Sequence, residues 1–312
     1  MRYPKTQLPD PKAIGAQLRT RFLGRNIVYT PETGSTNEDA KALGGRHPEG
    51  TVFLSAVQIG GKGRLGRAWS SPPGGIYMSL TLRPDPVPPS IPVVSIVAGY
   101  AVTRAIREVT GLAAALKWPN DVLVQGKKVC GILCEMVLPP SPPEPLPAPA
   151  PLAAPSSHER PAAPTPLAPS ALPERPTPSP TDHRPLLVVG IGINACIDPS
   201  SLPPEVRVTA CSLTSLLGDA VNASTLAAAV LNHFEPAYLQ FLEDGLSPFL
   251  QGIHEVAAFL GQPVVIGNRS MGDKDSVQGV FREIDAQGRA IIEVSGGKRI
   301  ALSAGDLSLR RT

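Results

Sequence analysis

The sequence predicts an α+β protein in which a large domain of helices and strands is followed by a small β-barrel. Between residues 12 and 245, apolar positions at helical spacing alternate with short strand-like runs. From Gly261 onward, glycine turns separate several short strand patterns, which is typical of an SH3-like or OB-like barrel. Residues 139–185 hold 18 of the 37 prolines and almost no aromatic or β-branched residues that could pack a core. We therefore expect this stretch to be a disordered, Pro/Ala-rich insertion.

These patterns divide the 312 residues into an N-terminal tail (1–25), a large domain (26–260) and the barrel (261–312). In the tail, Ile14, Leu18 and Phe22 recur at four-residue spacing, which predicts a helix over residues 12–23. The insertion lies between two strands that would otherwise be neighbours.

The large domain is expected to alternate between strands and helices. The run LLVVGIGINA is almost wholly apolar, which is typical of a central strand buried on both faces. Serine or threonine at 35–36 caps a helix that ends at Leu43, and Ser224 caps a later one. The predicted strands are 26–30, 51–58, 76–82, 113–118, a hairpin turning at Gly126, and 186–195, and the other helices are 92–110, 212–217 and 224–242.

Composition excludes several classes of protein. The net charge is only +3 and no long basic run is present, so non-specific binding to nucleic acid is not expected. The four cysteines form no CxxC pair and no histidine lies near them, which argues against a zinc site or a disulfide framework. No signal peptide or membrane-spanning apolar run is evident, so we expect a cytoplasmic protein.

A glycine-rich basic segment, QIGGKGRLGRAW at residues 58–69, is the sharpest feature. Its four glycines allow close approach of backbone N–H groups to a ligand, while Lys62, Arg64 and Arg67 add positive charge. The segment is neither a Walker A loop nor a dinucleotide fingerprint. A solvated hairpin would explain the glycines and cations but not Trp69, so the segment favours an anion-binding loop, with phosphate as the obvious anion.

A second cluster of polar residues, KWPND, ends the strand at 113–118. Lys117, Asn120 and Asp121 would place a cation, an amide and a carboxylate at a sheet edge, where ligands bind in α/β proteins. The carboxylate could hold Mg²⁺, although a turn capped by Asn120 and Asp121 explains the pattern too. Lys128 follows on the returning strand, where a solvated edge charge is the alternative to a site residue.

Taken in order, GSTN, GGKGRLGRAW, KWPNDV, GKKVCGILCEM, VVGIGIN and GDLSLR resemble the motifs of bacterial biotin–protein ligases. The resemblance covers about residues 27–138 and 186–312. It implies a fold like that of class II aminoacyl-tRNA synthetases, a mixed sheet with helices on one side, followed by an SH3-like barrel.

The resemblance also implies an activity: activation of biotin with ATP to biotinyl-5'-AMP, then transfer to a lysine of the biotin carboxyl carrier protein of acetyl-CoA carboxylase or a related carboxylase. ATP and biotin would be substrates, with Mg²⁺ as a cofactor held by Asp121. The implied catalytic residues are Lys128, Arg64 and Asp121. Residues implied to bind biotin are Ser35, Thr36, Asn37, Gln58, Lys62, Gly63, Arg64, Lys128, Gly131 and Leu133. Those implied to bind ATP are Arg64, Arg67, Trp69, Lys117, Asn120, Asp121, Lys128, Asn194 and Arg310.

The sequence departs from the family pattern at two places: Lys62 stands where arginine is usual, and the insertion follows Leu138. A lipoate or octanoate ligase, or a biotin-binding regulator, is the alternative function. About 25 residues precede the first predicted strand, too few for a winged helix, so we expect the monofunctional type without DNA binding. A monomer or weak homodimer is expected.

Overall fold

The computed structural model describes residues 8–85, 87–88, 91–138, 184–267, 276–304 and 308–311. A seven-stranded mixed sheet, in the order β1-β2-β3-β7-β6-β5-β4, forms the body of the protein. Only its edge pair β1–β2 is parallel, and the other neighbours are antiparallel. Its strands are β1 (Ile27–Thr33), β2 (Val52–Gln58), β3 (Ile76–Leu82), β4 (Ala114–Lys117), β5 (Asp121–Val124), β6 (Lys127–Val137) and β7 (Leu186–Ile193). The predicted mixed sheet is confirmed.

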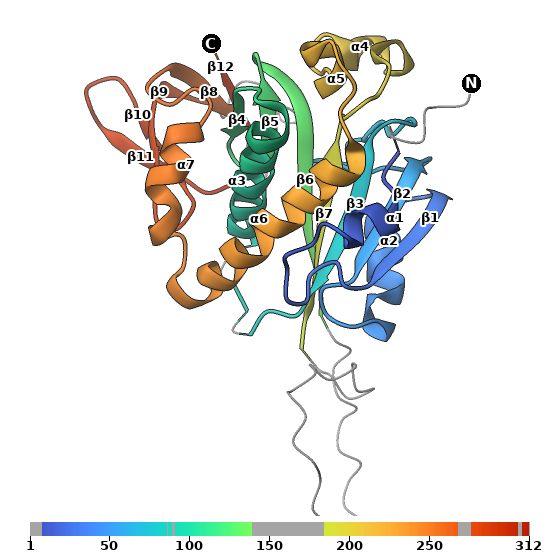
Figure 1. Cartoon of the computed structure of the whole chain (residues 1–312). Helices are drawn as coiled ribbons and strands as arrows, with labels where there is room; N and C mark the ends of the chain where they lie inside the picture. The colour runs from blue at the N-terminus through green and yellow to red at the C-terminus, as the bar shows by residue number, and fades with distance from the viewer. Residues whose placement is uncertain are drawn as a thin grey trace, which may run out of the picture.

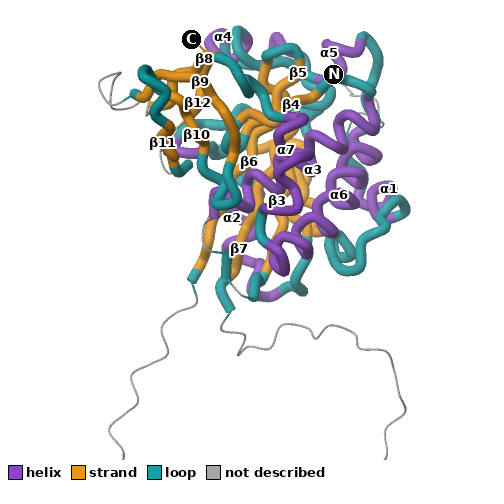
Figure 2. The backbone as a smooth tube through the Cα atoms, turned by 90° about the vertical axis from the view of Figure 1, so that its left-hand side faces the viewer, coloured by secondary structure: helices purple, strands orange, loops and turns teal. Residues whose placement is uncertain are grey.

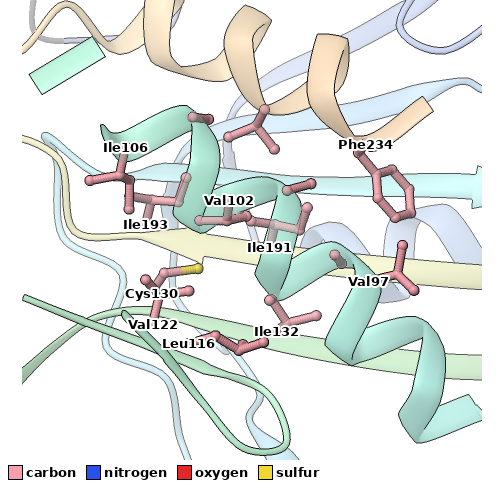
Figure 3. Packing of buried hydrophobic residues seen from close by; sticks show 14 of the residues in the cluster. Val97, Val102, Ile106, Leu116, Val122, Cys130, Ile132, Ile191, Ile193 and Phe234 are labelled. Atoms are coloured by element: carbon pink, nitrogen blue, oxygen red, sulfur yellow. The ribbon is translucent and has the colours of Figure 1, made fainter. Parts of the chain in front are cut away.

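Two long helices, α3 (Ile91–Thr110) and α6 (Ala223–Asp244), lie on one side of this sheet (Figures 1 and 2). Apolar side chains of α3, α6 and the sheet form one core between them. Figure 3 shows part of that core, with Val97, Val102 and Ile106 of α3 facing Leu116, Val122, Cys130, Ile132, Ile191 and Ile193 of the sheet. No helix among the described residues is long and apolar enough to cross a bilayer.

β7 is the central strand, as its apolar sequence predicts. Leu187, Val189 and Ile191 point into the core with α3 and α6, while Val188 packs on the other face against Ala40 of α2. Because successive side chains of a strand alternate between faces, Gly190 and Gly192 share the face of Val188. The short helix α2 (Thr36–Leu43) therefore lies across the sheet from α3 and α6.

The predicted helix over residues 12–23 is wrong, because α1 spans only Pro11–Gly15. The following residues give their backbone N–H groups to side chains of α6. Asn232 Oδ1 accepts a hydrogen bond from Arg19 N, and the buried Glu235 carboxylate accepts from the N–H groups of residues 21–23. These donors are thereby unavailable to a helix. The predicted cap of α6 is also corrected: Asn222 caps it, and Ser224 Oγ instead accepts from Asp10 N.

The Glu235→Ala variant should lower the free energy of unfolding by about 2–4 kcal/mol, because three backbone N–H groups, one of them buried at Leu23, would lose a buried charged acceptor. Urea unfolding followed by circular dichroism measures this loss. Glu243 lies exposed on the same helix, so Glu243→Ala should change stability by less than about 0.5 kcal/mol. Equal effects of the two substitutions would show that the N-terminal segment is not held by Glu235.

The C-terminal strands form a five-stranded antiparallel sheet, as expected for an SH3-like barrel. A helix that the sequence did not predict, α7 (Leu250–Val256), leads into it. The packing is continuous across the predicted boundary at residue 261, because Val264 and Phe281 belong to the same core as α3. Trp118 Nε1 also donates to the Gly288 carbonyl at 3.0 Å. The strands are β8 (Pro263–Gly267), β9 (Val277–Ile284), β10 (Ala290–Glu293), β11 (Arg299–Leu302) and β12 (Ser308–Arg311).

The predicted insertion separates two paired strands, as expected. β6 and β7 are antiparallel neighbours up to the pair Val137–Leu186, and Arg83 and Arg184 exchange hydrogen bonds beside that pair. The disorder predicted for 139–185 concerns residues that, up to 183, lie outside the described ranges.

Candidate active site

A cavity of about 420 Å³ lies on the face of the sheet that carries α2. Its walls come from the start of α2, the glycine-rich loop, the β4–β5 turn, β6, β7 and the barrel strand β12. All the predicted site residues except Asn194 line it: Ser35, Thr36, Asn37, Gln58, Lys62, Gly63, Arg64, Arg67, Trp69, Lys117, Asn120, Asp121, Lys128, Gly131, Leu133 and Arg310. Motifs spread over more than 270 residues of sequence thus meet around one space.

Lys128 lies at the centre of the charged residues in this cavity. Its Nζ is 2.5 Å from Asp121 Oδ1 and 5.0 Å from the centre of the Trp69 ring, within the range of a cation–π contact. Lys117 Nζ holds the other carboxylate oxygen of Asp121 at 3.1 Å. Asp121 therefore fixes two lysines, and one of them faces the indole.

The pKa of Asp121 bears on its predicted roles. Burial alone would raise that pKa, but the charges of Lys128 and Lys117 lower it below its ordinary value. A carboxylate with a lowered pKa is a weak general base, and both oxygens of this one already accept ammonium groups. The arrangement suits a residue that orients lysines better than one that removes a proton.

The predicted magnesium site does not fit these residues well. A cation on Asp121 would have to displace two ammonium groups from its oxygens. The described residues contain no group of three metal-binding side chains either. We therefore assign no chemical step to a metal held by this chain.

The α2 end of the cavity is a polar floor made by the GSTN segment. Thr36 N donates to Gln58 Oε1 at 2.9 Å, and Asn37 Oδ1 accepts from Ser79 Oγ at 2.6 Å. Asn37 Nδ2 donates to Glu135 Oε2 at 2.7 Å. A Cβ atom on Gly190 would lie 2.1 Å from Asn37 Oδ1, so this position of β7 requires glycine.

The glycine-rich loop folds back on itself as a short hairpin above the floor. Gly63 N donates to the Arg67 carbonyl at 2.7 Å, and Trp69 N donates to the Gly61 carbonyl at 2.9 Å. The tip reverses at Leu65 and Gly66, whose φ values of 60° and 69° are left-handed. The predicted anion loop is therefore an ordered structure at the cavity.

Arg64 ties the loop to two other parts of the protein. One guanidinium nitrogen donates to Asn120 Oδ1 and another to the Ala304 carbonyl of the barrel, both at 3.0 Å. The loop, the β4–β5 turn and the C-terminal domain are thus joined by one side chain at the mouth of the cavity.

Trp69 lies against the two glycine-bearing strands. A Cβ on Gly192 would lie 2.5 Å from its Nε1, and one on Gly131 would lie 3.0 Å from its ring. The indole Nε1 is buried and has no hydrogen-bond partner among the described residues, which leaves a donor for a ligand. Asn194, in contrast, does not line the cavity and donates to the Cys211 carbonyl at 3.2 Å.

Several cavity residues were not predicted from the sequence. Gly190 and Gly192 had a signal, two glycines two residues apart in a buried strand. Thr209 and Phe259 had none, because each comes from an irregular segment and carries no distinctive chemistry. The other unpredicted lining residues are Ala68, Tyr77, Leu123, Gly126, Ile132 and Ile191.

The insertion leaves the sheet at the end away from Lys128. β6 begins at Lys127 and continues four residues, about 13 Å of strand, beyond Leu133 at the cavity. Figure 1 shows this end of β6 and β7 pointing away from the short helices α4 (Pro204–Arg207) and α5 (Leu213–Leu217). Replacing residues 140–183 with Asn-Gly should therefore change the activity that the resemblance implies, adenylate formation, by less than about twofold, because a short turn can join this antiparallel pair. Pyrophosphate release measures the rate. A fall of tenfold or more in a folded variant would show that the insertion contributes to the site.

Comparison with known proteins agrees with this arrangement. Residues 31–139 match the model of the biotin/lipoate A/B protein ligase family. The bifunctional ligase/repressor BirA of Bacillus subtilis (strain 168) is 27% identical over 289 residues, covering 92% of this chain and 75% of the relative. A biotin–[acetyl-CoA-carboxylase] ligase of Mycobacterium tuberculosis is 28% identical over 305 residues, with 93% of each chain covered.

Solved structures show the same relationship in three dimensions. A biotin protein ligase from Aquifex aeolicus in complex with biotin and ATP matches with a TM-score of 0.69 and 27% identity, covering 92% of this chain and 100% of that one. The sequence motifs, the mixed sheet and these matches agree. Over residues 31–139 the chain resembles the biotin/lipoate A/B protein ligase family, and over most of its length it is similar to known biotin–protein ligases.

Proposed function

We propose that this chain is a biotin–protein ligase, which joins biotin to AMP from ATP and then passes the biotinyl group to a lysine of a biotin carboxyl carrier protein. The observation that carries the proposal is the single cavity in which the polar α2 floor, the glycine-rich loop and the Lys117–Asp121 turn surround Lys128. The structural relative matched above contains both biotin and ATP.

The two substrates can be assigned to opposite sides of Lys128. On the α2 side, the hydroxyls and amide of residues 35–37 suit the ureido head of biotin. Gly131 and Leu133 would form an apolar surface against which its hydrocarbon chain lies. Gln58, Lys62 and Gly63 border that side. On the other side, the proposed nucleotide contacts are Arg64, Arg67, Trp69, Lys117, Asn120, Asp121 and Arg310. Asn194 does not line the cavity and would act on the nucleotide only through the backbone that it contacts, such as the Val129 carbonyl.

In the first step, a carboxylate oxygen of biotin attacks the α-phosphorus of ATP, and the bond to the β-phosphate breaks to release pyrophosphate. Two anions must meet for this to happen, so catalysis consists mainly of neutralising charge and aligning the reactants. Lys128, held by Asp121 and the Trp69 ring, would bridge the carboxylate and the α-phosphate. ATP would enter as its magnesium complex, held chiefly through phosphate oxygens.

In the second step, the neutral amine of the carrier lysine attacks the acyl carbon of the adenylate and AMP leaves. The adenylate is a mixed anhydride that water would destroy, so the site must exclude solvent between the steps. The loop lines the cavity and is tied by Arg64 to the barrel, an arrangement that would serve this requirement.

Incubation of the protein with ATP and Mg²⁺, with either biotin or lipoate, tests the proposal. Mass spectrometry should find biotinyl-5'-AMP with biotin and no acyl-adenylate with lipoate. Since the matched family includes both kinds of ligase, formation of lipoyl-AMP alone would replace biotin with lipoate in the proposal. No adenylate with either acid would reject it.

The proposal includes the partners and location. The carrier domain is the expected macromolecular partner, in the cytoplasm, where ATP and carboxylases are present. We expect no DNA binding and a monomer or weak homodimer, which gel-shift and sedimentation measurements test directly.

Arg64→Gly should give a ligase that releases its adenylate into solution. The variant lacks the hydrogen bonds to Asn120 and Ala304 that hold the loop over the cavity, so the reactive intermediate can leave. Biotinylation of an added bystander protein should rise about tenfold or more as sequestration fails. Arg46, a basic residue outside the cavity lining, gives the matched control Arg46→Gly. Unchanged labelling of the bystander by Arg64→Gly would contradict this role of the loop.

A further inference from the structure

A continuous series of polar contacts runs from the glycine-rich loop to the cavity floor. Lys62 Nζ lies 2.6 Å from Glu38 Oε1, and Lys41 Nζ lies 2.8 Å from the same oxygen. Lys41 also contacts Glu135 Oε1 at 2.9 Å, and the other oxygen of Glu135 accepts from Asn37. We call these five residues, Asn37, Glu38, Lys41, Lys62 and Glu135, the Glu38 network.

We propose that Glu38 is a positioning residue of the active site, which fastens Lys62 of the loop to helix α2 and, through Lys41 and Glu135, to Asn37 on the cavity floor. Its effect on ligands rests on the proposed function, whereas its effect on the loop does not. Neither Glu38 nor Lys41 lines the cavity, so both would act through the residues they hold.

The local structure explains why the loop needs such a contact. Lys62 is flanked by Gly61 and Gly63, which have no side chains to anchor the backbone. The first half of the loop is joined to the α2 side by the hydrogen bond from Gly60 N to the Gly34 carbonyl. The Lys62–Glu38 pair adds a side-chain contact two residues further along.

The same contact gives a physical reason for lysine where the family usually has arginine. In this protein the residue meets one carboxylate oxygen, which Lys41 shares. A flexible stem with a compact charge suits such a one-point contact, whereas a guanidinium is suited to bidentate binding of a phosphate. Lys62 therefore serves to hold the loop against helix α2.

The carboxylate of Glu38 and the ammonium groups of Lys41 and Lys62 stabilise one another in their charged forms. Hydrogen bonds from Lys41 and then Lys62 lower the pKa of Glu38. Burial opposes the charge of Lys41, but its hydrogen bonds to Glu38 and Glu135 raise its pKa overall. The Glu38 and Lys62 side chains are 43% and 53% exposed, so salt will screen their pair and its effect will be moderate.

Hydrogen–deuterium exchange of the full chain without ligand tests the proposal. In Glu38→Gln and in Lys62→Met, amides of residues 60–69 should exchange about 3–10 times faster than in the unmodified protein, as expected for losing a partly exposed ion pair. The double variant should exchange no faster than either single one, because both substitutions remove the same contact. Lys62→Arg keeps the charge but not the compact head, so its loop should exchange faster than in the unmodified protein and slower than in Lys62→Met.

Two controls separate this role from a general effect on folding. Glu32→Gln removes an exposed carboxylate from neighbouring β1 and should leave exchange of the loop unchanged. Raising the salt from 0.05 to about 1 M should speed loop exchange in the unmodified protein and not in Glu38→Gln, because a charge pair is screened at that concentration. Unchanged loop exchange in a folded Glu38→Gln variant, or equal sensitivity to salt, would overturn the proposal.

Ligand binding then tests the connection to the cavity floor. Calorimetry with biotin should show a dissociation constant about 3–10 times higher for Glu38→Gln, in proportion to the loosening of the loop. If the unmodified protein binds no biotin, the proposed function fails while the exchange result stands. If it binds biotin and Glu38→Gln binds it equally well, despite faster loop exchange, Glu38 does not position the site.

Discussion

Lys128→Ala should slow adenylate formation about a thousandfold, which is the range observed when one preorganised charge-stabilising group is removed. Lys128 is the residue where the proposed biotin and nucleotide sides of the cavity meet. Its ammonium is fixed by Asp121 at 2.5 Å and faces the Trp69 ring, so little reorganisation is needed when the two anions approach.

The measurement is pyrophosphate release with saturating biotin and ATP. The loss should fall on the maximal rate as well as on kcat/KM, since the charge acts most strongly as the new bond forms. Removing Lys128 also leaves Asp121 with Lys117 as its remaining ion partner in the cavity, so the melting temperature must be compared.

Lys127 provides the matched control, because it is the adjacent lysine of β6 and is exposed. Lys127→Ala should retain nearly the full rate. A folded Lys128→Ala variant that releases pyrophosphate at the normal rate would remove Lys128 from the catalytic assignment, whatever its effect on the second step.

The sheet could be predicted well from the sequence, because its strands have distinct patterns of apolar residues. The run at 186–193 is apolar on both faces and is the central strand, and the Gly126 turn joins β5 and β6 as expected. The N-terminal helix failed for a physical reason. Ile14, Leu18 and Phe22 have helical spacing, but Glu235, more than 210 residues away, takes the N–H groups that a helix would need.

The site was predictable where its residues have distinctive chemistry. Glycines beside cations, and the KWPND turn, marked most of the charged residues in the cavity lining. The contacts of those residues were not predictable: Lys62 meets Glu38 and Arg64 meets the barrel, since both depend on tertiary packing. Thr209 and Phe259 have no local signal and reach the cavity only through the fold.

Gly192→Ala should lower kcat/KM for ATP about a hundredfold, because a displacement of about 1 Å at a positioning group can have this effect. A Cβ at this position would lie 2.5 Å from Trp69 Nε1 and 2.8 Å from Cε2, which is too close for a rigid ring to tolerate. The indole must move, and Lys128 would lose the ring that it faces.

Gly190→Ala should instead impair the biotin side. Its Cβ would lie 2.1 Å from Asn37 Oδ1, so the amide that Ser79, Glu135 and the Leu133 carbonyl hold in place would be displaced. Gly190 and Gly192 are two residues apart on the same face of β7, so the added methyl groups are chemically identical and differ only in the neighbour that they displace.

The pair of glycines therefore tests the division of the cavity into two halves. Steady-state kinetics should show the larger rise in KM for ATP with Gly192→Ala and for biotin with Gly190→Ala. Gly45→Ala, where a Cβ would meet no atom within 4 Å, should change neither. If both β7 variants changed the two constants equally, a common distortion of the strand would explain them, and the assignment of biotin to the α2 side and of the nucleotide to the Trp69 side would fail.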